Sequence, residues 1–380
     1  MATYWWIGAS SGVWELAANW SSSQTGSPAA SIYPGNGTTD DIVFIKASMR
    51  TNQISSITGN KTISMLIADE TSATNITSIN HINITEAALF YGTSTVNKFY
   101  ILGNCVFSGQ YSDNNNVIEG SAIFSGANAS NSGTIHGKFG GSVSNLVSSV
   151  VFTGADSANT GTIEQDAIFS GYSSQNNGTV NGSAIFSGGD DGSSFNYNNG
   201  TVSGSAIFSG PQSYNGEYTP TLTGTVGENA IFSGQYSFNA YLVSGDAIFS
   251  GYSSAAGMDS QIGGNAIFSG HSSQNNYEVY GSAIFSGPAS VNYNVVYGSA
   301  IFSGATSYNT DTVSGSAIFS GATSYNYTAG TISQHALMLS AGTYNLGTIS
   351  GAFLPMVPLT GTPSTGTAVK YPLDILNAGI

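Results

Sequence analysis

Charged residues are scarce in this chain of 380 residues. Asp, Glu, Lys and Arg together make up 7% of it, and the formal net charge is −14 because 20 acidic residues oppose only 6 basic ones. Of these basic residues only Lys138 lies within residues 105–351. A surface with so few cations cannot neutralise phosphate groups, so we expect no nucleic-acid partner and no binding to anionic membranes.

Cysteine, long apolar runs and catalytic motifs are lacking as well. The lone Cys105 excludes an intrachain disulfide and is expected to be a small buried residue. No run is long and apolar enough to span a bilayer, and the first twenty residues lack the basic and apolar regions of a secretory signal. We find no nucleophile elbow, zinc-protease motif, P-loop, Cys-x-x-Cys or dinucleotide fingerprint. Acidic residues do not recur at one offset, although the neighbouring Asp40 and Asp41 could hold a cation. We therefore expect a protein that is not an enzyme and has no cofactor or metal.

What the chain does have is a repeat built on Ser-Ala-Ile-Phe-Ser-Gly. Seven of the eleven intervals between its twelve phenylalanines are 17 residues, and a fixed period of this size indicates a repeat architecture. The copies fall at Phe107, Phe124, Phe152, Phe169, Phe186, Phe208, Phe232, Phe249, Phe268, Phe285, Phe302 and Phe319, with Met338 in a degenerate thirteenth.

Each repeat has the same internal order. Gly, Ser, Asn, Val or Ile, and Gly follow at offsets 2, 5, 7, 11 and 13 after Phe107, Phe268 and Phe302. Two short apolar runs, each closed by Gly and separated by polar turn residues, are typical of two strands. The sequence therefore predicts an all-β fold, a single-stranded β-solenoid (β-helix) with about 17 residues and two short strands per coil.

Stacked coils place each residue over its own copy at the strand spacing of about 4.8 Å, so roughly thirteen coils predict a rod about 60 Å long. The Asn residues should then hydrogen-bond amide to amide along the axis. We explain the recurrent glycines by corners that need a positive φ or a close backbone approach.

The flanking segments are expected to differ from the repeat body. Residues 1–57 hold all four tryptophans and are interpreted as an N-terminal cap or attachment domain, the alternative being a carbohydrate or partner site on those rings. Residues 58–104 are expected to form irregular entry coils, residues 105–351 the regular solenoid, and residues 352–380, with four prolines, an extended tail.

Alternation along Ala-Ile-Phe-Ser points Ile and Phe to opposite faces of their strand. A single coil has one interior, so a continuous Ile or Phe stripe should be exposed, and an apolar patch of that extent usually marks an interface. We expect this stripe to pack against another copy, as a trimer in preference to a dimer, or against a second layer of the chain. The candidate stripe is Ile123, Ile168, Ile185, Ile207, Ile231, Ile248, Ile267, Ile284, Ile301 and Ile318.

Two neighbouring repeats within residues 187–231 carry insertions, which should emerge close together. Their aromatic rings and carboxylates suit a sugar ligand, and the alternative is tolerated loop decoration. An enzymatic alternative is a glycan depolymerase that pairs Asp190 or Asp191 with Glu217 or Glu228. The candidate glycan-binding residues are Phe195, Tyr197, Tyr214, Tyr218, Asp190, Asp191 and Glu217.

The repeats resemble those of β-solenoid shafts in bacteriophage tail fibres and other virion appendages, and also repeat regions of bacterial surface adhesins. The resemblance covers about residues 100–351 and rests on Ala-Ile-Phe-Ser-Gly, Ser-x-Asn and Thr-Val-x-Gly. It implies a structural protein of a virus particle, a fibre, spike or appendage that acts as a rigid spacer beside other virion proteins and attaches to a host glycan. The alternative is a secreted bacterial adhesin or surface-layer protein at the cell surface.

Overall fold

The computed structural model describes residues 2–8, 13–25, 30–37, 39–45, 60–68, 82–137, 149–189, 195–216, 224–257, 259–340, 342–355 and 365–368. The chain divides into two compact units, Met1–Ile185 (unit 1) and Phe186–Ile380 (unit 2). The short 3-10 helix η1 (Ala17–Asn19) is the one helix among these residues, and none of the described segments is a helix long and apolar enough to cross a membrane.

Unit 1 opens with strands that lead into the repeat. They are β1 (Thr3–Trp6), β2 (Trp20–Ser21), β3 (Ile42–Ile45), β4 (Lys61–Ala68) and β5 (Ile82–Phe90). Strand β1 pairs antiparallel with β2 and parallel with β3, and the parallel pairing then continues through β4 to β5. The amino-terminal segment is therefore hydrogen-bonded to the same sheet as the coils of its unit.

Most regular coils contain three short strands, and in the coil between β36 (Val291–Asn292) and β37 (Ala300–Phe302) isolated bridges of Val296 replace the middle one. In one coil of unit 2 the three strands are β38 (Tyr308–Asn309), β39 (Thr312–Val313) and β40 (Ala317–Phe319). We call them the Asn, Val and Phe strands after the buried residue that each contains. The β-solenoid with its spacing of about 17 residues is confirmed, but the prediction of two strands per coil is wrong. The Ser-x-Asn segment is a third strand because it pairs in parallel with its own copies, which satisfies its backbone groups.

In unit 1 the three kinds of strand recur in chain order. The Phe strands are β8 (Asn104–Phe107), β11 (Ala122–Phe124), β14 (Ser149–Phe152) and β17 (Asp166–Phe169). The Val strands are β7 (Tyr100–Ile101), β10 (Val117–Ile118), β13 (Thr134–Ile135), β16 (Thr162–Ile163) and β19 (Thr179–Val180). The Asn strands are β6 (Val96–Asn97), β9 (Asp113–Asn114), β12 (Ser130–Asn131), β15 (Ala158–Asn159) and β18 (Gln175–Asn176). Strand β20 (Ala184–Phe186) contains the boundary between the units.

Unit 2 repeats the same order. Its Phe strands are β23 (Ala206–Phe208), β26 (Ala230–Phe232), β29 (Ala247–Phe249), β32 (Ala266–Phe268), β35 (Ala283–Phe285), β37 (Ala300–Phe302), β40 and β43 (Ala336–Met338). Its Val strands are β22 (Thr201–Val202), β25 (Thr225–Val226), β28 (Leu242–Val243), β31 (Gln261–Ile262), β34 (Glu278–Val279), β39, β42 (Thr331–Ile332) and β45 (Thr348–Pro355). Its Asn strands are β21 (Asn196–Asn198), β24 (Ser213–Asn215), β27 (Phe238–Asn239), β30 (Ala255–Ala256), β33 (Gln274–Asn275), β36 (Val291–Asn292), β38, β41 (Tyr325–Asn326) and β44 (Tyr344–Asn345), and β46 (Thr365–Ala368) follows them.

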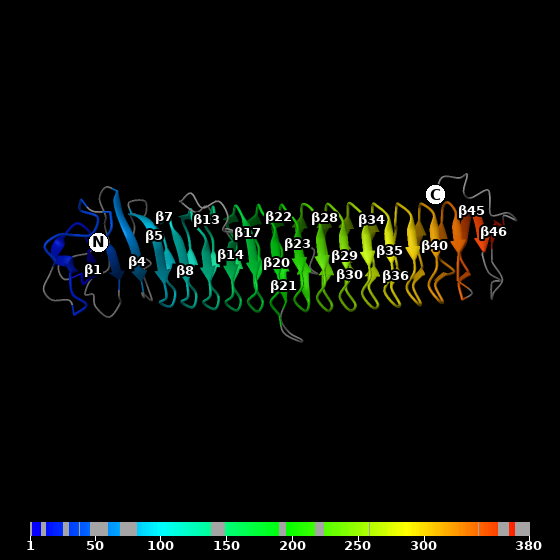
Figure 1. The fold of residues 1–380 in the computed structure, drawn as a ribbon, viewed down its shortest axis with the longest axis horizontal. Coiled ribbons are helices and arrows are strands. Elements are labelled where there is room, and N and C mark those ends of the chain that lie inside the picture. Colours follow the sequence, from blue (N-terminus) through cyan, green and yellow to red (C-terminus); the bar gives the residue numbers. More distant parts are fainter. Residues whose placement is uncertain are drawn as a thin grey trace. The chain divides into compact units, whose positions relative to one another are not determined.

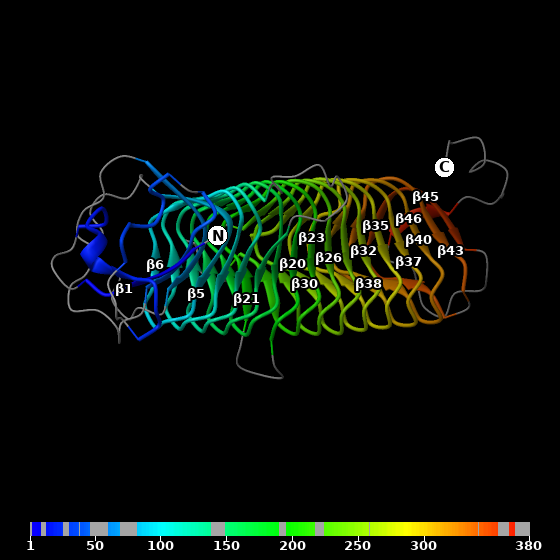
Figure 2. The ribbon, with the colours of Figure 1, turned by 60° about the vertical axis from the view of Figure 1, so that its left-hand side comes forward.

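Like residues stack on like residues within each unit. In unit 2 Phe285, Phe302 and Phe319 lie in register on adjacent parallel strands, as do Asn292 and Asn309. Figure 1 shows β23, β29, β35 and β40 following one another in chain order, and Figure 2 shows the Asn strands β30 and β38 on a different side of the coils from the Phe strands.

The core is a column of stacked phenylalanine rings. Phe302 is fully buried, and its ring lies parallel to those of Phe285 and Phe319 with centroids 4.8 and 4.7 Å away. The same stack occurs in unit 1, where the Phe107 and Phe124 rings lie 4.7 Å apart. Phe therefore lines the interior, together with the Ala two residues before it, and the intervening Ile faces outward.

The predicted amide ladder is present along the Asn strands. Asn309 is fully buried, accepts a hydrogen bond from Nδ2 of Asn292 at 2.7 Å and donates to Oδ1 of Asn326 at 2.9 Å. In unit 1 the amide of Asn97 donates in the same way to Asn114, at 2.7 Å. A buried amide is stable here because each coil supplies the partner that the next coil needs.

The Gly that recurs two residues after Phe allows close packing of neighbouring coils. A Cβ built on Gly304 would lie 2.0 Å from the carbonyl oxygen of Gly287, so only glycine fits this corner. The positive φ of the turn falls two residues later on residues with side chains, such as Tyr236 (φ 57°) and Ser253 (φ 50°). Of the two explanations for these glycines, close approach is therefore the one that applies at this position.

Three of the four tryptophans form a small core in unit 1. Trp6, Trp14 and Trp20 are fully buried, with ring centroids 4.9 Å apart for Trp6 and Trp20 and 4.5 Å apart for Trp14 and Trp20. Their indole groups are used internally, since Nε1 of Trp20 donates to the carbonyl of Trp14 at 2.7 Å. Buried rings present no face to a ligand, which favours a capping role over a carbohydrate site on these three residues.

Candidate functional site

Three of the predicted glycan-binding residues form one aromatic cluster in unit 2. The Phe195 ring stacks on Tyr214 with centroids 5.3 Å apart, and Tyr197 lies 5.8 Å from Phe195 and 5.5 Å from Tyr214. Tyr197 and Tyr214 are register partners on β21 and β24, so the coil geometry brings them together. The other four predicted residues, Asp190, Asp191, Glu217 and Tyr218, lie outside the described residues.

The cluster lines part of a groove of about 580 Å³. Two further aromatic residues, Tyr236 and Phe238, line it beside the three predicted ones. The Phe238 ring stands nearly perpendicular to Tyr214, with centroids 6.0 Å apart and an interplanar angle of 82°. Tyr236 and Phe238 were not predicted, because they lie in a repeat of ordinary length after the inserted residues. Their offsets of 4 and 6 after Phe232, shared with Gln212 and Tyr214 after Phe208, would have located them.

The groove results from a change of residue size along one column. The residue next to the buried column position in each Asn strand is aromatic in the first three coils of unit 2, then Ala, Gln or Val in three coils, then aromatic again. This outer column consists of Tyr197, Tyr214, Phe238, Ala255, Gln274, Val291, Tyr308, Tyr325 and Tyr344, each in register with the next. Ala255 is too small to fill the space beside Phe238, so a hollow remains there.

A glycine positions the Phe238 side chain. A Cβ built on Gly257 would lie 2.1 Å from Cζ of Phe238, and its three nearest atoms all belong to that ring. The outer end of the phenyl ring therefore lies directly over Gly257, in the coil that follows. Because Gly257 carries no side chain, the Phe238 ring can lie across the neighbouring coil.

The part of the groove that follows the rings along the coils is polar and uncharged. Ser253, Gln274 and Asn276 line it, and none of the described lining residues is ionic. The described part of unit 2 contains no Lys or Arg. Burial also raises the pKa of the Tyr214 phenol, so this ring stays neutral at physiological pH. The groove thus combines ring faces with hydroxyl and amide groups that both donate and accept.

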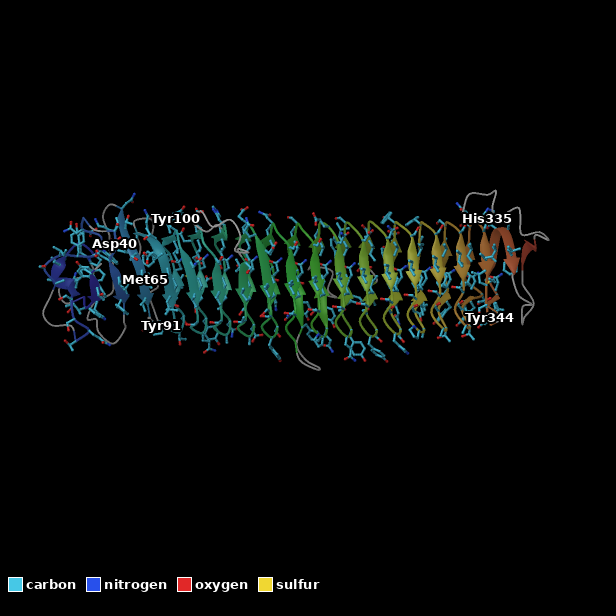
Figure 3. The ribbon with its side chains drawn as sticks, viewed as in Figure 1. Asp40, Met65, Tyr91, Tyr100, His335 and Tyr344 are labelled. Carbon is cyan, nitrogen blue, oxygen red and sulfur yellow. The ribbon has the colours of Figure 1, made fainter. Side chains whose placement is uncertain are left out.

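A second aromatic surface lies farther along the same column. Tyr308, Tyr325 and Tyr344 stack face to face, with successive centroids 4.8 and 4.7 Å apart. Burial, followed by the hydrogen bond between its hydroxyl and that of the neighbouring Tyr293, raises the pKa of Tyr308 well above its usual range. Figure 3 shows Tyr344 at the edge of the coils opposite His335. Here the rings cover one another along the column, whereas beside the groove the aromatic column is interrupted at Ala255.

The candidate Ile stripe faces outward in both units. Ile123 is 44% exposed in unit 1 and Ile301 is 37% exposed in unit 2, whereas the adjacent Phe residues are fully buried. The others in the stripe are exposed or half-buried, and Ile301, Ile318 and Leu337 border a hollow of about 190 Å³. The orientation of the stripe is therefore clear, and its role in oligomer formation stays a prediction.

Carboxylates in the described residues serve structural contacts. Glu228 accepts a hydrogen bond from Ser205 at 3.0 Å, and Asp41 accepts one from the backbone of Gly35 at 2.8 Å. Glu119 binds Tyr100 at 2.5 Å and His136 at 2.9 Å. No group of three or more potential metal ligands occurs among the residues described.

The single cysteine has the environment that was predicted for it. Cys105 is buried in the position that Ala occupies in other Phe strands, and desolvation raises the pKa of its thiol well above the usual value. A buried thiol with a raised pKa is unreactive.

No protein-family model, curated protein or solved structure matches this chain. Its function must therefore be inferred from the coils and the surfaces that they present.

Proposed function

We propose that this chain is a non-enzymatic structural protein of a virus particle, a fibre, spike or appendage whose coils act as a rigid spacer and which also attaches to a glycan on the host. The observation that supports it best is the in-register stacking of identical residues from coil to coil. A parallel backbone ladder, a stack of rings and a buried amide ladder run side by side in each unit. All three resist bending, which suits a spacer.

Assembly with a second copy is part of the proposal. The outward stripe presents Ile301 and Ile318 at adjacent coil positions, and its neighbouring column members such as Leu337 are also aliphatic. A column of this kind matches an identical column on another copy, since both repeat at the strand spacing of about 4.8 Å. Burying it removes from water the contiguous apolar surface that an isolated chain exposes.

Antibody labelling distinguishes the proposed location from the alternative. Antibodies raised against the purified chain are applied to virus particles and to intact cells of the source and viewed by electron microscopy, with pre-immune serum as the control. We expect label on the particles. Label confined to cell surfaces would contradict the proposal in favour of a surface-layer protein or adhesin. In a separate assay, release of oligosaccharides from host capsule by the purified chain would favour a depolymerase.

A further inference from the structure

We propose that the groove beside Phe238 is a binding site for a neutral oligosaccharide, whose sugar rings stack on Tyr236 and Phe238 while Gln274 and Asn276 hydrogen-bond to its hydroxyl groups. This inference names the ligand class and the site for the attachment role in the proposed function. It applies equally to a chain carried on a virus particle or on a cell.

The length of the groove favours an extended ligand. Its lining comes from the successive Asn strands β21, β24, β27, β30 and β33 and the turns beside them. The coils that line it span four spacings of about 4.8 Å, or about 19 Å, which suits several linked sugar rings better than a monosaccharide. Its volume of about 580 Å³ falls within the usual range for small-ligand sites of about 300–1,000 Å³. A stable protein partner would need a larger surface.

The chemistry of the lining favours a sugar over other extended ligands. Aromatic faces pack against the C–H faces of pyranose rings, and Tyr236 is 45% exposed, so its ring is accessible. Amide and hydroxyl groups both donate and accept hydrogen bonds, as sugar hydroxyls do. The side chains of Ser253, Gln274 and Asn276 provide such groups in the two coils that follow the rings.

The charges of the unit favour a neutral sugar. None of the described residues that line the groove is a cation, and the described part of unit 2 has no Lys or Arg that could pair with a carboxylate or sulfate on a glycan. The net charge of the chain is −14, which repels anionic polymers. Sialylated, sulfated and uronic-acid glycans are therefore expected to bind poorly.

Binding is tested with the purified full-length chain on an array of neutral and anionic oligosaccharides, followed by calorimetry with a neutral glycan that binds. Phe238→Ala and Tyr236→Ala should each weaken binding about tenfold, as expected for the loss of one stacked ring. The matched control is the pair Tyr280→Ala and Tyr297→Ala, which removes two exposed rings that stack on each other outside the groove. The control should bind like the wild type.

Two further variants change the shape of the groove while keeping all its rings. Gly257→Ala places a methyl group where the Phe238 ring now lies, so the ring must move. Ala255→Tyr continues the aromatic column through the hollow, as Tyr325 does between Tyr308 and Tyr344. Both should retain the wild-type melting temperature to within a few degrees, because the first displaces only a side-chain end and the second uses a residue that this column already holds. Both should lower the affinity at least as much as Phe238→Ala.

Three results would overturn the inference. They are a preference for anionic glycans, affinity for a neutral glycan that survives the loss of both Tyr236 and Phe238, and the absence of binding to every neutral glycan on the array. Each is independent of the antibody experiment, so a failure of the glycan site is distinguishable from a failure of the proposed location.

Discussion

Ala256 is the register partner of Asn275 in the buried amide column, and Oδ1 of Asn275 accepts no hydrogen bond from any described residue. In the following coils the equivalent Oδ1 accepts a hydrogen bond from the Asn of the preceding coil, as when Asn292 donates to Asn309 at 2.7 Å. The methyl group of Ala256 cannot donate, so the ladder is interrupted at this coil and a buried carbonyl is left without a partner.

Ala256→Asn should therefore stabilise the protein. The new Nδ2 would face Oδ1 of Asn275, and the new Oδ1 would face Asn239 in the coil before it. We expect a gain of about 1 kcal/mol in the free energy of unfolding, measured by urea denaturation. Ala256→Leu is the matched control, because it has a similar volume and no donor. Equal effects of Asn and Leu would contradict the explanation.

Phe302→Ala should destabilise the protein strongly. Its ring is buried between Phe285 and Phe319, so truncation removes two stacking contacts and leaves a cavity. The expected loss is about 3–5 kcal/mol, from urea denaturation. Phe302→Met should cost less than about 1.5 kcal/mol, since Met338 already occupies this column beside Phe319. Equal losses for Ala and Met would show that filling the column is unimportant.

Replacing Ile301 and Ile318 together with Ser should change the state of assembly and leave the fold intact. Both side chains lie on the outward face and contribute little to the interior. We expect the wild type to be an oligomer by light scattering and the double variant to have the mass of one chain, with an unchanged circular dichroism spectrum. A monomeric wild type, or a variant that keeps the oligomer mass, would contradict a role of the stripe in assembly.

Asp113 should make the stability of the protein depend on pH. Burial raises its pKa above the ordinary value of 3.8, and hydrogen bonds from Ser130 and Ser132 oppose this shift only in part. The folded protein therefore binds this proton more tightly than the unfolded chain does. The resulting stability is fully present below the ordinary pKa and is lost as the pH rises through the folded one.

Asp113→Asn removes this dependence. We expect the variant to unfold at higher urea concentration than the wild type at about pH 7, and the two to converge at about pH 3, where the aspartate is protonated in both states. The comparison is made by urea denaturation at both pH values. A variant that is less stable than the wild type at about pH 7 would show that the ionised carboxylate is stabilising.

Much of the fold follows from residue spacing. The interval of 17 residues and the recurrence of Asn309, Asn326 and their equivalents predicted stacked coils with an amide ladder, and both are present. The third strand was missed because Ser-x-Asn resembles a turn when one repeat is read alone. Its strand character depends on pairing with the neighbouring coils, as between Tyr308 and Tyr325.

The candidate site was less accessible to sequence reasoning. The inserted aromatic residues Phe195, Tyr197 and Tyr214 were predicted to gather, and they do. Tyr236 and Phe238 belong to the next repeat. That repeat has the ordinary length of 17 residues, so its length gives no sign of a site. They join the groove because strands β24 and β27 are adjacent.

The sequence by itself determined the coil. Because equivalent residues recur at a fixed period, stacked coils pair the backbone groups of neighbouring repeats and bury their Phe rings. It also determined that Ile and Phe face opposite ways. Only the tertiary structure decided that Phe is inside, and where a hollow forms. Ala255 is an ordinary small residue in its own repeat, and it becomes the floor of a groove because Phe238 and Gln274 flank it in space.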